Sequence, residues 1–88
     1  MIKYIAAFRS RSQTMRLFQA AKNSGIPCSV INTPREASIG CGISLYYCPE
    51  HHRAVYNLYS GGNYDALIGF YRMEKDVNGG THIFPLKT

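Results

Sequence analysis

The segment Lys3-Tyr4-Ile5-Ala6-Ala7-Phe8, followed closely by Ser10-Arg11-Ser12-Gln13, decides the fold. The first stretch is short and largely apolar, which indicates a strand whose two faces are both at least partly covered. In the second stretch Ser10 fits the N-cap of a helix, and Gln13 stands where the second residue of a capping box reaches back to the cap. The chain is therefore expected to begin with a strand that leads directly into a helix.

One face of this helix is apolar, and the helix has a defined end. Four residues at helical spacing form the face: Thr14, Leu17, Phe18 and Ala21. A face of this kind is expected to pack against a sheet. Gly25 suits the left-handed position that commonly ends a helix, so the helix is predicted to stop just before it.

Three further strands and a second helix are predicted downstream. The strands cover 26–31, 43–47 and 66–71, and Pro49 begins a helix that ends at Gly61-Gly62. Four residues of this helix are expected to face the core: Ala54, Val55, Leu58 and Tyr59.

The order βαββαβ predicts an α+β fold of the ferredoxin-like type. Such a sandwich has a four-stranded antiparallel sheet with two helices on one face. Residues 1–73 would form this domain, and residues 74–88 a C-terminal extension that is either a tail or an additional edge strand.

Composition narrows the class of protein. The chain has 88 residues, of which 45% are hydrophobic, and this suits one folded domain. No apolar run approaches the roughly 18 residues of a membrane helix, and the N-terminus lacks the features of a signal peptide, so we expect no membrane contact and a cytoplasmic protein.

The net charge of +5 comes from ten Lys+Arg residues against five Asp+Glu residues. The electrostatic field of a basic protein favours acidic partners and anionic ligands. The sequence has no run of five basic residues of the kind that would suggest a nucleic-acid-binding arm. The strand around 67–72 also lacks the aromatic pattern of RNA-binding sheets. Nucleic acid is therefore not the expected partner.

The three cysteines, Cys28, Cys41 and Cys48, are an odd number, which argues against a disulfide scaffold. They include no Cys-x-x-Cys pair, so a four-ligand zinc site has little support. Cys28 lies in an apolar strand and is interpreted as a core residue. Cys48 precedes the second helix and is a candidate resolving thiol for an oxidised Cys41, provided that the two Cα atoms come within about 7 Å.

Cys41 is the candidate catalytic thiol, because Gly40 and Gly42 flank it in a predicted loop between two strands. Flanking glycines expose backbone N–H groups and leave room for an electrophile, and Arg35 could add the positive charge that stabilises a thiolate. The alternative is a tight turn around a small buried cysteine. The segment Thr33-Pro34-Arg35-Glu36 before it fits a capping box.

Other kinds of site have little support. His51 and His52 are adjacent, so they diverge around a helix, and we interpret them as a solvated helix start rather than a metal pair. No metal and no cofactor is expected, and no Ser/His/Asp pattern or carboxylate pair suggests a hydrolase. The tyrosines Tyr46, Tyr47, Tyr56 and Tyr59 are expected in the core, at its rim or at a subunit interface.

Taken together, Asn32-Thr33-Pro34-Arg35-Glu36 and Gly40-Cys41-Gly42-Ile43 resemble the selenium/sulfur carrier-like family of small proteins, over about residues 3–73. The resemblance implies a carrier thiol at Cys41 that holds a persulfide or selenopersulfide. It also implies a pyridoxal-phosphate desulfurase as donor and an acceptor protein that is unknown.

The leading hypothesis is thus a sulfur or selenium carrier, not an enzyme in its own right. The alternative is a regulatory or scaffold module that binds a partner, a small ligand or a second copy of itself through the sheet.

Overall fold

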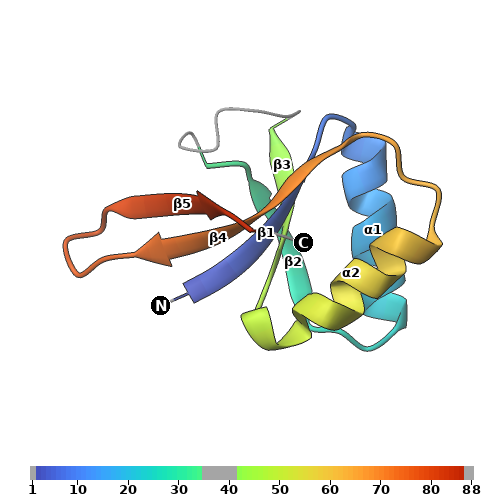
Figure 1. Cartoon of the computed structure of the whole chain (residues 1–88), viewed down its shortest axis with the longest axis horizontal. Coiled ribbons are helices and arrows are strands. Elements are labelled where there is room, and N and C mark those ends of the chain that lie inside the picture. The colour runs from blue at the N-terminus through green and yellow to red at the C-terminus, as the bar shows by residue number, and fades with distance from the viewer. Residues whose placement is uncertain (1, 35–41, 87–88) are drawn as a thin grey trace.

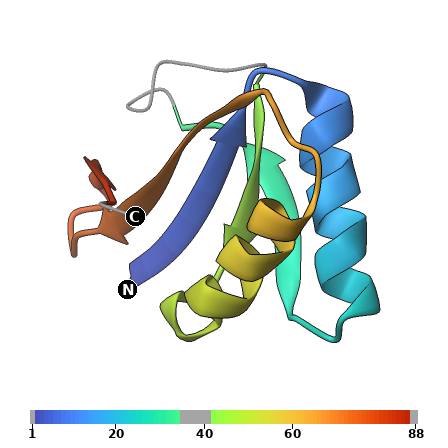
Figure 2. The same cartoon turned by 45° about the vertical axis from the view of Figure 1, so that its right-hand side comes forward.

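The computed structural model describes residues 2–34 and 42–86, and this part of the chain holds five strands, two α-helices and a 3-10 turn. In chain order they are β1 (Ile2–Phe8), α1 (Arg11–Asn23), β2 (Cys28–Asn32), β3 (Ile43–Tyr47), η2 (Pro49–His51), α2 (His52–Gly61), β4 (Leu67–Lys75) and β5 (Thr81–Pro85). Figures 1 and 2 show both helices on the same side of the sheet.

The strands form one antiparallel sheet in the order β2-β3-β1-β4-β5. The predicted α+β class is confirmed, and the order of the first four strands is compatible with the ferredoxin-like layout. The sheet has five strands rather than the four predicted, because the C-terminal segment pairs with β4 as an edge strand. β4 itself runs to Lys75, across the boundary that was placed between residues 73 and 74.

β1 is the central strand, and residues Ile5 to Phe8 are completely buried. Ala6 lies opposite Leu45 of β3 and Phe70 of β4, so these three side chains share one face of the sheet. The helices cover this face, where the main core is made of Ala6, Phe8, Leu17, Ala21, Ile26, Leu45, Tyr47, Val55 and Phe70.

The start of α1 follows the predicted capping box only in part. The Ser10 hydroxyl accepts a hydrogen bond from the Gln13 backbone N–H at 3.2 Å, as expected for an N-cap. The Gln13 side chain does not reach back to Ser10. Its Nε2 donates to Asp65 at 2.6 Å and its Oε1 accepts from the N–H groups of Asp65 and Ala66, so the amide ties α1 to the segment before β4. The end of α1 is as predicted, with Gly25 at φ +79°.

The face that α2 turns to the sheet differs from the prediction. Val55 is buried, and Leu58 and Tyr59 pack against the core, but Ala54 is exposed. Because residues 49–51 form a 3-10 turn, the α-helix and its inner face begin at His52. The residues at spacing i, i+3, i+4 and i+7 on that face are His52, Val55, Tyr56 and Tyr59.

His52 is therefore a packing residue, and its interpretation as part of a solvated helix start was wrong. Its Nδ1 is 2.8 Å from the hydroxyl of Tyr47, and the two rings lie parallel at 6.0 Å. Tyr4 and Phe70 meet the imidazole edge-on at 5.1 and 5.2 Å. Burial disfavours the charged ring and lowers the pKa of His52 below its usual 6.5.

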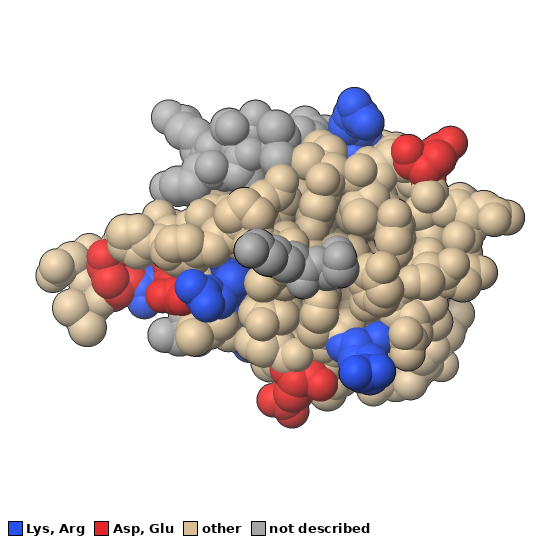
Figure 3. All heavy atoms as spheres, viewed as in Figure 1, with Lys and Arg blue, Asp and Glu red and all other residues tan. Residues whose placement is uncertain are grey.

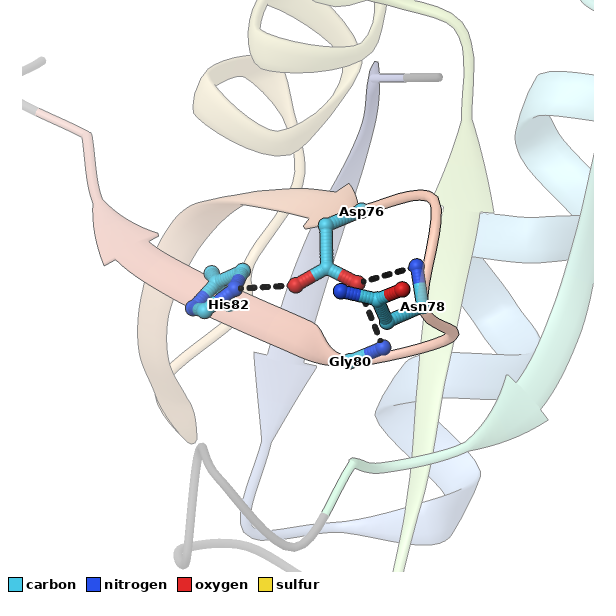
Figure 4. Close-up of polar contacts among 4 residues, drawn as sticks. All are labelled: Asp76, Asn78, Gly80 and His82. Carbon is cyan, nitrogen blue, oxygen red and sulfur yellow. Dashed lines mark hydrogen bonds and ion pairs between the residues drawn. The ribbon is translucent and has the colours of Figure 1, made fainter.

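A single carboxylate organises the turn between β4 and β5 (Figure 4). Asp76 Oδ1 accepts from the N–H groups of Asn78 and Gly80 at 2.9 and 2.8 Å, and Oδ2 lies 3.1 Å from Nε2 of His82. Gly79 supplies the positive φ of +84° that the turn needs. The hydrogen bond from His82, followed by that from Gly80, lowers the pKa of Asp76 below 3.8.

Within residues 2–34 and 42–86, neither α-helix has the length and apolar composition needed to cross a membrane.

Replacing His52 should weaken the pH dependence of folding. The ring binds a proton more readily in the unfolded chain, so wild-type stability is full above pH 6.5 and falls as the pH drops through 6.5 toward the lower folded pKa. We expect urea titrations at pH 7.5 and 5 to show a smaller loss on acidification in His52→Gln than in wild type. His51→Gln, at the neighbouring position, should keep the wild-type loss. Equal losses in all three proteins would contradict the packing role.

Removing the Asp76 carboxylate should loosen the β4–β5 turn. In Asp76→Ala the amides of Asn78 and Gly80 lose their acceptor, and we expect their hydrogen exchange at pH 7 to accelerate while α1 amides keep their rates. In wild type the protection should be present above pH 3.8 and be lost as the pH falls through the lower folded pKa of Asp76. Glu50→Ala, at an exposed acid elsewhere, is the control.

Candidate functional site

The predicted reactive loop connects two paired strands, and its flanks are described. Arg35, Gly40 and Cys41 lie outside the described residues. β2 ends and β3 begins at the cross-strand pair Asn32–Ile43, and the Thr33 N–H donates to the Gly42 carbonyl at 2.8 Å beyond that pair. The connection therefore starts and ends at neighbouring positions of the sheet.

A hydrogen bond between two hydroxyls fixes the base of this connection. Thr33 Oγ1 and Ser44 Oγ are 2.6 Å apart, and Ser44 is completely buried. The hydrogen bond satisfies a polar group that would be costly to bury alone. It also gives the Thr33 hydroxyl a partner on β3, while the rest of the capping box predicted at Thr33 lies outside the described residues.

Gly42 is the one predicted binding residue that the structure describes. It is exposed and has φ +105°, a conformation that residues with a Cβ atom rarely adopt. A Cβ atom placed there would meet no heavy atom within 4 Å. Glycine is therefore favoured at position 42 by the backbone angle and not by lack of space, and the space beside the chain is open.

A groove of about 450 Å³ lies on the sheet face away from the helices, next to Pro34. Its residues come from β2, β3, β4, β5 and the start of the loop: Ile31, Asn32, Pro34, Tyr46, Met73, Lys75 and Thr81. Lys75 gives the groove a positive charge near the point where the chain enters the loop. The arrangement suits an anionic group or a partner segment held beside residues 35–41.

Cys48, the candidate resolving thiol, follows the other end of β3. It is six positions after Gly42, and β3 is extended, so the two lie about 20 Å apart at ~3.3 Å per residue. Gly42 directly follows Cys41 in the chain. A disulfide between Cys41 and Cys48 within one molecule would therefore require β3 to leave the sheet.

Sequence reasoning missed a partner of Cys48. The Lys3 ammonium donates to the Cys48 sulfur at 3.1 Å. The contact arises because Tyr4 lies opposite Tyr47 in the antiparallel β1–β3 pair, and the same register places Lys3 directly opposite Cys48 at the next position. Cys28, interpreted as a core residue, packs against the core but is only half-buried.

The charges do not form one basic patch on the face that Figure 3 shows, where blue and red groups lie side by side. An ion pair joins Arg72 Nε to Glu74 Oε2 at 2.8 Å. Among the described residues no three His, Cys, Asp or Glu side chains cluster in a way that could hold a metal ion.

Comparison with known proteins gives one match. A family model described as "Putative Se/S carrier protein-like" matches residues 3–67, which is most of the chain and includes the Gly40-Cys41-Gly42 segment. No curated protein and no solved structure matches.

Replacing Gly42 by alanine should destabilise the protein through the backbone. The positive φ is unfavourable for alanine, and we expect the free energy of unfolding to fall by about 1–2 kcal/mol. Gly61→Ala is the matched control, because its Cβ atom also meets nothing within 4 Å but its φ is not positive. Chemical denaturation measures both. Equal stability of the two variants would remove the conformational requirement at Gly42.

Proposed function

This chain belongs to the Se/S carrier protein-like family, and from that membership we propose that it carries sulfur or selenium as a persulfide or selenopersulfide on Cys41. The observation that carries the proposal is the family match, because the matched region includes the Gly-Cys-Gly segment. We place this carrier in the cytoplasm, on a ferredoxin-like domain, and it is not an enzyme in its own right.

The loading step is a sulfur transfer between two thiols. The Cys41 thiolate attacks the outer sulfur of a persulfide on the donor, the donor's S–S bond breaks, and the donor thiolate leaves and takes up a proton. The donor in this proposal is a pyridoxal-phosphate cysteine desulfurase. Delivery repeats the step, with a nucleophile of the acceptor attacking the outer sulfur on Cys41 and the Cys41 thiolate as leaving group.

Each flanking residue has a role in this proposal. Gly40 and Gly42 keep the surroundings of the thiol open and offer backbone N–H groups to the anionic sulfur, and Arg35 supplies positive charge. Three described features support it: the exposed Gly42, the open space beside it and the groove with Lys75 next to Pro34. A donor protein could insert its own cysteine-bearing segment into that groove.

The second candidate function is a regulatory or scaffold module, and the groove of about 450 Å³ on the sheet face away from the helices is the observation that favours it. Such a module would bind a partner, a small ligand or a second copy of the chain, and its binding would not depend on a thiol. Binding that survives Cys41→Ser, together with a failure of the loading experiment, would favour this candidate.

The loading experiment is incubation with a cysteine desulfurase and cysteine, followed by intact mass measurement. We expect the wild type and a Cys28→Ser/Cys48→Ser variant to gain the mass of one sulfur, which a reductant then removes. Cys41→Ser should gain none. An equal gain in Cys41→Ser, or no gain in the wild type, would end the carrier proposal.

A further inference from the structure

A second hollow lies at the far end of β3 from the reactive loop and has a volume of about 240 Å³. Its walls come from β1, β2 and β3 and the residues that flank them: Lys3, Pro27, Cys28, Ser29, Tyr46, Tyr47 and Cys48. Two cysteines and one lysine are thus among the residues that border this hollow. Pockets that hold drug-sized ligands are larger, about 300–1,000 Å³, so this hollow suits the arm of a small thiol compound.

Cys48 and Lys3 form a pair in this hollow. The ammonium donates to the sulfur at 3.1 Å and lies 5.6 Å from the centre of the Tyr46 ring. The hydrogen bond to Cys48 is the main cause of a raised pKa for Lys3, so the lysine keeps its charge across the range in which thiols react. A cation in contact with the sulfur also attracts an anionic compound that approaches the thiol.

Cys28 shares the hollow but lacks this arrangement. It packs against the hydrophobic core, and burial is the main cause of a raised pKa for its thiol. Lys22 acts on it in the opposite sense but more weakly. The two cysteines are therefore an internal comparison within one chain, because Cys48 is in contact with an ammonium group and Cys28 is packed against the core.

We propose that Cys48 is a modification site that forms mixed disulfides with small anionic disulfides, and that Lys3 selects for their negative charge. The Cys48 thiolate attacks one sulfur of the incoming disulfide, the S–S bond of that compound breaks, and one half leaves as a thiolate that takes a proton from water. The half that stays is joined to Cys48 by the new S–S bond, with its carboxylate beside Lys3. No additional oxidant is needed, because the incoming disulfide is itself reduced.

This site does not rest on the proposed carrier function. β3 keeps Cys48 at the opposite end of the strand from Gly42, and the described residues around the hollow do not include the flanks of the loop, Thr33, Pro34 and Gly42. The inference can therefore be tested in chains in which Cys41 is replaced, so that its failure and the failure of sulfur loading on Cys41 are separate results.

The experiment uses two chains, each with one thiol: Cys28→Ser/Cys41→Ser, which keeps Cys48, and Cys41→Ser/Cys48→Ser, which keeps Cys28. Each reacts with dithiodipropionate, which is anionic, and with cystamine, which is cationic and of similar length. Intact mass gives the rates. Dividing each rate for Cys48 by the rate for Cys28 with the same compound removes the intrinsic difference between the compounds, since leaving-group chemistry affects both thiols.

We expect this ratio to be at least about fivefold higher for dithiodipropionate than for cystamine, as an adjacent cation attracts one compound and repels the other. Lys3→Gln in the Cys48 chain should abolish the preference, and Lys3→Arg, which keeps the charge, should retain it. Lys75→Gln is the control at a lysine that lines the other hollow. Circular dichroism checks that each variant is folded. Equal ratios for the two compounds, or a preference that survives in Lys3→Gln, would overturn the proposal.

Discussion

The pairing of β1 with two neighbours at once is the constraint on which the other placements depend. Ile5 to Phe8 are fully buried, and the strand is bonded to β3 on one side and β4 on the other. Ala6 and Phe8 lie under the helices, while Ile5 and Ala7 point to the opposite face. A slip by one residue would exchange these two sets, so burial on both faces holds the register firmly. The same register brings Lys3 to Cys48, which means that core packing also determines the surroundings of a surface thiol.

Much of the fold could be predicted because its signals are local. The strand at 43–47, the Ser10 cap and the positive φ of Gly25 depend on a few adjacent residues, and each was predicted correctly. β4 was predicted too short because its second half contains Arg72, Glu74 and Lys75, which look like the end of a strand. Pairing with β5 makes that half regular, and polar side chains are tolerated there because the hairpin projects beyond the helices, as Figure 1 shows.

Contacts between distant segments could not be predicted in the same way. The Gln13 side chain was predicted to bond to the nearby Ser10 N–H in a capping box. It accepts instead from backbone N–H groups more than fifty residues away in the sequence. Whether His52 faces the core depends on the residue at which the 3-10 turn ends and the α-helix begins. Pro49 indicates that a helix starts nearby but does not fix that residue. For the candidate site, the sequence motif singled out Cys41 through its neighbours and a family resemblance. Lys3 could be matched to Cys48 only once the β1–β3 register was known.

β3 connects two thiol environments of different kinds. At the start of β3, the space beside Gly42 is open. The neighbouring groove is lined by one cation, Lys75, which comes from β4. At the end of β3, Cys48 lies in a small hollow with a lysine in direct contact. If both proposals hold, the extended strand keeps the two reactions apart, because it separates Gly42 from Cys48 by about 20 Å. On the proposed roles, Cys48 can therefore be blocked by a mixed disulfide without closing the loop that carries Cys41, and any exchange between the two thiols must take place between molecules.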